Sequence, residues 1–117
     1  MKIKINGKFF EIKNLKICNE FEKFSGLMFS SKKNARALLF SFKKPTRLAI
    51  HSFFVFYPFL AIWLDNKNKI IKMSIIKPFN PIIKPKKSFL KLIEIPINEK
   101  YESFVKKFHY RRGSQKI

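Results

Sequence analysis

Acidic residues are scarce in this chain of 117 residues, which has seven Asp and Glu against 26 Lys and Arg. Between Lys23 and Leu64 there are seven basic residues and no acid, and eight more lysines separate Asp65 from Glu94. A formal net charge of +19 repels cations and attracts polyanions, so it restricts the partners more than any local motif does. A biased genome composition would also favour Lys over Arg, but it explains the shortage of acids less easily.

Cysteine and glycine are also rare, which excludes further classes of protein. Because Cys18 is the only cysteine, the chain cannot form an internal disulfide, and a reducing compartment is compatible with it. Residues 2–5 alternate Lys with Ile instead of forming the apolar stretch of a signal peptide, so we expect a cytoplasmic protein. The three glycines form no phosphate-binding loop.

Side chains suited to catalysis or metal binding are sparse. The chain has two histidines, one cysteine and seven scattered acids, whereas a zinc site needs about four converging ligands. His51 lies among apolar residues and is interpreted as a hydrogen-bonded core side chain, and Cys18 as a small structural thiol. No acids are spaced as a local catalytic pair. We therefore expect no enzyme activity and predict neither a metal site nor a cofactor.

Apolar and aromatic residues, by contrast, are plentiful. Hydrophobic residues make up 46% of the chain, which includes fifteen Phe, whereas a disordered basic tail would be poor in aromatics. The length fits one domain with a real core. We predict a single β-rich domain over residues 1–110 and a basic C-terminal tail over residues 111–117.

The longest uncharged segment covers residues 48–64, and it suggests either a membrane span or buried strands. As a helix it would extend roughly 25 Å, short of a ~30 Å hydrocarbon core. Pro58 would also interrupt that helix near its middle. Because the segment is rich in Phe, Val, Tyr, Trp and Ile, which favour strands, we predict two buried strands joined near Pro58 and no transmembrane span.

Turn and cap residues divide the rest of the chain. Asn6-Gly7 predicts a tight hairpin within residues 2–17, and Asn98 predicts the cap of a final helix over 99–108. The class is therefore mainly β (α+β). The other predicted elements are a short helix near 20–25, strands over 37–42, 69–75 and 88–95, a break at 43–46 and an extended surface segment over 77–87. The predicted core includes Phe40, Phe42, Val55, Ile62, Leu64, Ile93 and Phe104.

Several stretches, taken in order, resemble one known family. They are Gly26-Leu27-Met28-Phe29, Leu39-Phe40-Ser41-Phe42, the run from Ile50 to Asp65, Lys77-Pro78-Phe79, the lysine-rich stretch around Pro85 and Leu92-Ile93-Glu94-Ile95-Pro96. Over about residues 17–110 the chain is similar to the domain-of-unknown-function family numbered 192, especially its archaeal members. The resemblance implies a compact, barrel-like, mostly β domain with short helices and no established reaction.

Two positions depart from the family's pattern, and both have lost an acid. The family usually carries an acidic residue just after the proline-apolar pair, where this chain has Leu60. It usually ends in a Gly-Asp turn and a last short strand, where this chain has Arg112-Gly113-Ser114. If the acidic position binds a shared ligand, this member has lost that ligand. If the position is structural, nothing follows for function.

Clusters of basic residues are the candidate binding sites. Lysine neutralises phosphates without reading sequence, whereas base-specific contacts favour Arg and Asn, and the chain has only four arginines. This favours contacts to the backbone and shape of a structured RNA. Because the aromatic residues fall mostly at core-like positions, the sequence gives no basis for a stacking platform. The clusters are Lys32, Lys33 and Arg36; Lys43, Lys44 and Arg47; Lys84, Lys86, Lys87 and Lys91; and Lys106, Lys107, Arg111 and Arg112.

These observations lead first to a non-enzymatic basic protein that binds RNA through its phosphate backbone, for example as a ribosome-associated component. Each cluster alone is also typical of a solvated turn, but four on one small domain favour a binding surface. Two alternatives stay open. One is a family member whose pocket binds or transforms a small molecule, and the other is a peripheral protein held on anionic lipid.

Overall fold

The computed structural model describes residues 1–5, 7–18, 27, 30–52, 54–80 and 82–111, with the backbone alone at residues 5 and 108–111. This part of the chain contains seven strands and one helix, which confirms the mainly β class. The elements are β1 (Lys2–Ile5), β2 (Lys8–Glu11), β3 (Lys16–Ile17), β4 (Leu38–Thr46), β5 (Phe59–Leu64), β6 (Ile70–Ile76), β7 (Phe89–Pro96) and α2 (Glu102–Arg111). The predicted helix near 20–25 lies outside the described residues.

β1 and β2 form the tight hairpin that Asn6-Gly7 predicts. Ile5 pairs with Lys8, so two residues connect the strands, and Gly7 has a φ of 81°. Glycine adopts such a positive φ without steric penalty. The hairpin ends at Glu11 rather than near residue 17, because β3 pairs instead with β4 in the other sheet.

The other five strands form one open sheet in the order β3-β4-β7-β5-β6. β7 lies in its middle and pairs antiparallel with β4 on one side and β5 on the other. The predicted barrel is wrong, since no closed barrel is found among the described strands. β3 contributes only two residues at one edge, and β6 forms the other edge of the sheet that the structure describes.

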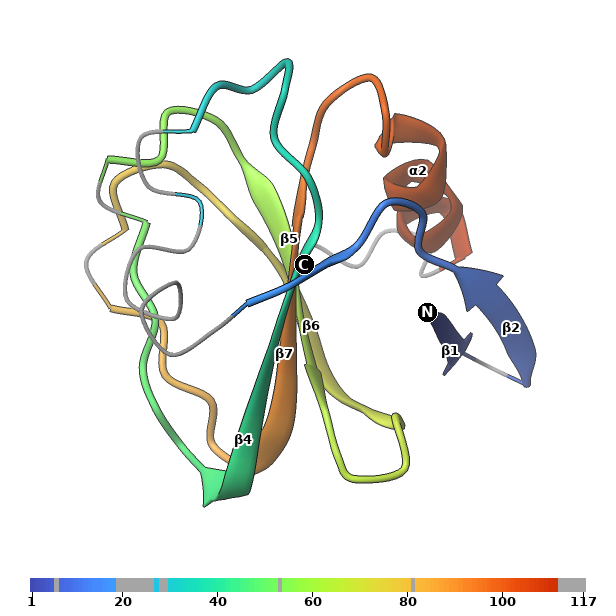
Figure 1. Ribbon diagram of the computed structural model, residues 1–117, viewed down its shortest axis with the longest axis vertical. Coiled ribbons are helices and arrows are strands. Elements are labelled where there is room, and N and C mark those ends of the chain that lie inside the picture. Colours follow the sequence, from blue (N-terminus) through green and yellow to red (C-terminus); the bar gives the residue numbers. More distant parts are fainter. Residues whose placement is uncertain (6, 19–26, 28–29, 53, 81, 112–117) are drawn as a thin grey trace.

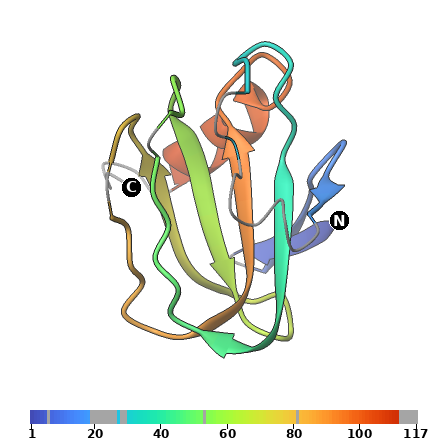
Figure 2. The same ribbon diagram turned by 60° about the vertical axis from the view of Figure 1, so that its left-hand side comes forward.

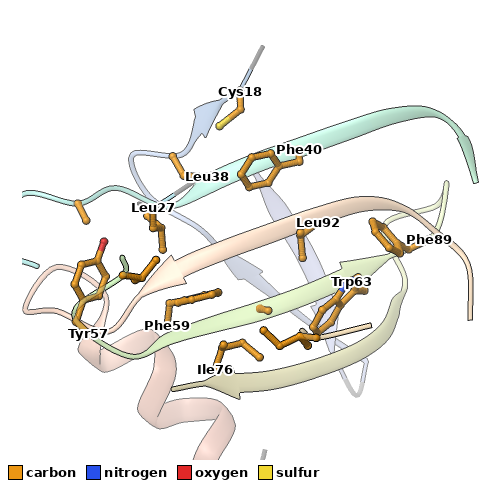
Figure 3. Close-up of a cluster of buried hydrophobic side chains, with 14 residues drawn as sticks. Cys18, Leu27, Leu38, Phe40, Tyr57, Phe59, Trp63, Ile76, Phe89 and Leu92 are labelled. Carbon is orange, nitrogen blue, oxygen red and sulfur yellow. The ribbon is translucent and has the colours of Figure 1, made fainter. Parts of the chain in front are cut away.

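Both faces of this sheet are covered, which gives the protein two apolar clusters (Figure 1). One cluster lies between the sheet and a layer formed by the hairpin β1–β2 and α2. The other lies beneath the connecting segments 48–57 and 77–88, where Trp63 and Phe89 pack with Tyr57, Phe59 and Leu92 (Figure 3). β5 is buried along its whole length because its side chains alternate between the two clusters.

β4 continues through Pro45 to Thr46, where the sequence predicts a break. The regular pairing of β4 with β7 is interrupted between Ser41 and Thr46. Proline has no backbone N–H to donate to a sheet, so it is tolerated at such an irregularity. The strand therefore extends four residues beyond its predicted end and carries Lys43 and Lys44 with it.

Residues 48–57 do not form the predicted strand. Ile50 makes a single antiparallel bridge to Ile83, and Phe54 turns the chain with a φ of 59°. The described residues of 48–64 contain no helix either, and no helix elsewhere in the described part of the chain is long and apolar enough to cross a membrane. The second predicted strand is confirmed as β5.

Five of the seven predicted core residues are buried, namely Phe40, Val55, Ile62, Leu64 and Ile93. Phe42 and Phe104 are only partly buried and pack against the margins of the two clusters. Phe42 makes an edge-to-face contact with Phe89, with ring centroids 5.6 Å apart.

The final helix begins three residues later than predicted and extends to Arg111. Asn98 precedes it: its Oδ1 accepts a hydrogen bond from the Lys100 amide, and its carbonyl accepts one from Tyr101. Its side-chain amide donates to the carbonyls of Lys32 and Ala35. The start of the helix is thereby attached to the segment that precedes β4.

Replacing Tyr101 by Phe should destabilise the protein by about 1–3 kcal/mol. The buried Tyr101 hydroxyl accepts a hydrogen bond from the Ala37 amide at 2.9 Å and donates to the Lys13 carbonyl at 3.0 Å. Removing it leaves the Ala37 amide without that acceptor. Urea unfolding of both proteins measures the loss, and a difference below about 0.5 kcal/mol would show that another acceptor replaces the hydroxyl.

Candidate nucleic-acid interface

Two of the four predicted basic clusters meet at one end of the sheet, where β4 ends and β7 begins (Figure 1, bottom). Thr46 pairs with Phe89, and Arg47 Nε donates a hydrogen bond to the Pro85 carbonyl at 3.4 Å. Two clusters separated by about forty positions in the sequence thereby form one surface. The surface is termed the basic end, and its exposed members are Lys43, Lys44, Arg47, Lys84, Lys86 and Lys87.

The turn between β5 and β6 adds Lys67 and Lys69, which the sequence does not place near this surface. β5 runs antiparallel to β7, so its last residues lie beside the first residues of β7. Asp65 is the one acid in residues 43–47, 65–69 and 84–91. Its Oδ1 accepts hydrogen bonds from the backbone amides of Lys69 and Lys67, and these bonds lower the pKa of its carboxyl.

Lys91 belongs to the predicted third cluster but is half-buried, and its Nζ donates to Asn68 Oδ1 at 2.7 Å. It lines an open hollow of about 730 Å³ beside the loop that leads from β2 to β3. Apolar Leu39 and acidic Glu11 line the same hollow. Lys91 is therefore less available to an external phosphate than the exposed lysines of the basic end.

The first predicted cluster lies at the opposite end of the sheet. Lys32, Lys33 and Arg36 precede β4, whose nine residues span roughly 30 Å at about 3.3 Å per residue. Arg36 Nε donates to the Asn14 carbonyl at 3.0 Å. These three exposed residues are thus separated from the basic end by the length of the strand.

Three members of the fourth predicted cluster, Lys106, Lys107 and Arg111, belong to α2, which lies away from the basic end (Figure 1). Lys106 forms an exposed ion pair with Glu102 at 3.2 Å, which reduces its net charge contribution, and Lys107 is exposed. Arg111 is the last residue of the helix, and Arg112 lies outside the described residues.

Exposed apolar side chains gather on segments 48–57 and 77–88, contrary to the expectation that the aromatic residues are buried. Phe54, Phe56 and Phe79 are each about half exposed or more, and Leu48 and Ile82 flank them. The three phenylalanines are termed the aromatic strip. The exposure of Phe54 and Phe56 follows from alternation, since Val55 and Tyr57 on either side of Phe56 point into the core.

Glu94 is a buried carboxyl group that sequence reasoning did not assign to any site. It lies in β7 opposite Leu38 of β4 and Ala61 of β5, and it is only 6% exposed. Burial raises the pKa of Glu94 to about 8. Burial also raises the pKa of Tyr57, against its hydrogen bond with Ser30, and the Glu94 charge adds to that rise. The sequence does contain an indication of this buried carboxyl, because Glu94 is a lone acid within the apolar run 92–96.

The remaining chemically reactive residues form no site in the part of the chain that the structure describes. His51 is exposed, so the prediction that it lies in the core is wrong. Cys18 is buried in the cluster beneath the connecting segments, as expected for a structural thiol. No group of three or more His, Cys, Asp or Glu side chains that could hold a metal ion is found among the described residues.

Leu60, at the position where the family carries an acid, is fully buried. It belongs to the cluster between the sheet and α2, and it pairs with Ile75 and Ile95 on the neighbouring strands. In this chain the position is therefore part of the apolar core. It also lies on the opposite face of the sheet from Trp63, which belongs to the other cluster.

Two solved structures are similar to this chain. One is a protein of unknown function from Novosphingobium aromaticivorans DSM 12444, with a TM-score of 0.68 and 13% identity over 89% of this chain and 76% of that chain. The other is a "putative transcription regulator" from Sinorhizobium meliloti 1021, with a TM-score of 0.64 and 15% identity over 89% and 82% of the two chains. At these identities the likeness shows the fold alone.

Comparison with curated proteins gives no significant match. A family model, by contrast, matches residues 1–106, which is nearly the whole chain and slightly more than the sequence resemblance covers. The family is described as "Uncharacterized ACR, COG1430". The chain therefore belongs to the DUF192 family.

Proposed function

We propose that this DUF192 member is a non-enzymatic protein that binds RNA through its phosphate backbone, with the basic end as its main contact surface. The observation that carries the proposal is the meeting of two separate basic clusters where β4 ends and β7 begins. Six exposed cations lie there, and Asp65 is the one acid in the adjoining segments. A surface of this kind neutralises several phosphates at once and releases their counterions.

The chemistry of the surface favours recognition of shape over sequence. Five of its six members are lysines, whose compact charges contact phosphate, whereas bidentate reading of bases favours Arg. Structured RNA, such as that of the ribosome, is a partner of this kind. An RNA partner also agrees with the expected cytoplasmic location, and the likeness to archaeal family members stays a prediction from the sequence.

Affinity for RNA should fall steeply with salt. If the protein neutralises about six phosphates, its affinity for a labelled RNA hairpin should fall roughly a thousandfold or more between ~50 and ~200 mM KCl. Replacing Lys84, Lys86 and Lys87 together by Gln should reduce the slope of log affinity against log salt by up to about three. Fluorescence anisotropy over a salt series measures both quantities.

The matched control removes three exposed lysines from the opposite end of the sheet, with Lys32, Lys33 and Lys100 replaced by Gln. This control should leave the salt slope nearly unchanged. An equal reduction by both triple variants would show that binding is spread over the whole surface. Undetectable binding of the wild-type protein at low salt would refute RNA binding, and a ligand bound with no salt dependence would favour a small-molecule pocket.

A further inference from the structure

The aromatic strip lies on the same two segments that lead to the basic end, but toward the end of the sheet where β5 begins and β6 ends, and it has the properties of a binding surface. Phe56 and Phe79 are 62% and 52% exposed, and their rings meet edge to face with centroids 5.4 Å apart. Phe54 is 48% exposed on the same pair of segments. Three exposed phenylalanines within two neighbouring loops form more apolar surface than isolated exposed residues do.

Hydrogen bonds around Ser52 fix the backbone that presents these rings. Ser52 is fully buried, and its carbonyl accepts hydrogen bonds from the amides of Phe79 at 2.9 Å and Val55 at 3.2 Å. Its hydroxyl donates to the Lys77 carbonyl and accepts from the Asn80 amide, both at 2.6 Å. The two loops are therefore joined by one side chain.

Two of the exposed rings sit on strained backbone. Phe54 and Phe79 have φ values of 59° and 61°, a region that large side chains rarely adopt and that costs about 1–3 kcal/mol per residue. Such strain persists only where surrounding contacts impose it, and it occurs often at binding sites. The contacts of Ser52 supply that constraint for the backbone, and the edge-to-face contact packs the Phe56 and Phe79 rings against each other.

The two segments that carry the strip run side by side along one side of the sheet (Figure 2). The segments are joined at Arg47 and Pro85, at Ile50 and Ile83, and at Ser52 and Asn80. The aromatic strip is therefore the continuation of the basic end along one surface. Exposed Lys77 lies two residues before Phe79, and exposed Lys84 is the member of the basic end that follows Phe79 five residues later.

We propose that the aromatic strip stacks unpaired bases of an RNA whose adjoining phosphates contact the basic end. This proposal rests on the proposed function and deepens it, because it selects single-stranded segments of the RNA. Aromatic faces stack on any base, and lysines beside them track the backbone. Rings presented on a constrained backbone suit stacking, whereas insertion into a fluid membrane requires no such constraint. The sequence predicted contacts with the RNA backbone only, and base stacking adds a second kind of contact.

The test compares two fluorescent probes, a ~12-nucleotide oligouridine and an RNA duplex with the same number of phosphates. Replacing both Phe56 and Phe79 by Ala should weaken oligouridine binding at least about twentyfold, since each stacked base contributes about 5- to 150-fold. Duplex binding and the salt slope should stay unchanged. Phe9→Ala is the matched control, because Phe9 is 69% exposed but lies on the hairpin β1–β2.

Single substitutions separate stacking from general hydrophobicity. Phe56→Trp should retain oligouridine binding, and Phe56→Leu should lose about fivefold or more while keeping an apolar side chain and the fold. Circular dichroism and thermal melting confirm that the variants are folded.

The outcomes distinguish the two proposals. If the wild-type protein binds neither probe at low salt, the proposed RNA function fails. If it binds both with the expected salt dependence but the Phe56/Phe79 variant binds oligouridine equally well, only the stacking proposal fails. Equal losses for duplex and oligouridine also overturn stacking. Stacking is also overturned if the Phe56/Phe79 variant keeps oligouridine binding but loses binding to phosphatidylserine vesicles. That result would identify the strip as a membrane-contact surface.

Discussion

Replacing Glu94 by Gln should stabilise the protein by up to about 5 kcal/mol at about pH 9 and change its stability little below about pH 4.5. In the unfolded chain the carboxyl has its usual pKa of 4.5, whereas burial raises the pKa of Glu94 to about 8 in the folded protein. Between these values the folded protein holds a proton that the unfolded chain has released. Folding stability therefore falls as pH rises through this range, by about 1.4 kcal/mol per pH unit, and then levels off.

Urea unfolding at a series of pH values measures this effect as the difference between wild type and Glu94→Gln. Glu99→Gln is the matched control because Glu99 is exposed, and it should show no such difference. If wild type and Glu94→Gln had parallel pH profiles, Glu94 would be ionised in the folded protein and paired with a cation. The stability that the wild-type protein is predicted to lose, up to about 5 kcal/mol, is a large fraction of the usual 5–15 kcal/mol stability of a domain.

Replacing Leu60 by Asp, which restores an acid at the family's position, should destabilise the protein by at least about 4 kcal/mol. Leu60 is fully buried between Ile75 and Ile95, so the change removes apolar contacts and buries a carboxyl group. Because the buried carboxyl resists ionisation, the loss should increase as pH rises above the usual pKa of Asp.

Thermal and urea unfolding measure this loss, with Leu60→Met as the volume-conserving control, which should cost less than about 1.5 kcal/mol. A Leu60→Asp protein as stable as wild type would mean that this face of the sheet provides partners for a carboxylate. The position would then retain the environment of a family ligand site. We expect instead that Leu60→Asp loses stability, because the position belongs to the apolar core in this member.

Local signals predicted the elements that depend on neighbouring residues alone. The Asn6-Gly7 turn predicts the hairpin because positive φ is a property of those residue types, and Gly7 does adopt it. The uncharged stretch 59–64 predicts β5 because a strand buried on both faces needs apolar residues throughout. Asn98 predicts the last helix because its side chain can cap backbone amides, and its Oδ1 does accept a hydrogen bond from the Lys100 amide.

The features that the sequence did not predict depend on tertiary contacts. Segment 48–57 has strand-forming residues, but its pairing is limited to Ile50, and the bonds of Ser52 turn the chain instead. Its exposed phenylalanines, Phe54 and Phe56, are therefore exceptions to the prediction that the aromatic residues fall mostly at core-like positions. The burial of Glu94 depends on which strands flank β7, and the joining of the two basic clusters depends on the register of β4 with β7. The pairing of β7 with its neighbours cannot be read from the sequence.

The central position of β7 also determines when the sheet can assemble. β7 follows the other described strands along the chain and so is synthesised after them, yet both β4 and β5 pair with it. Until residues 89–96 have been made, β4 has only the two residues of β3 as a partner, and the locally formed hairpins cannot bury their apolar faces. Such long-range pairing slows folding and prolongs the exposure of apolar surface. During that interval the positive charge of the nascent chain opposes association between copies, an effect of the excess of lysine that requires no ligand.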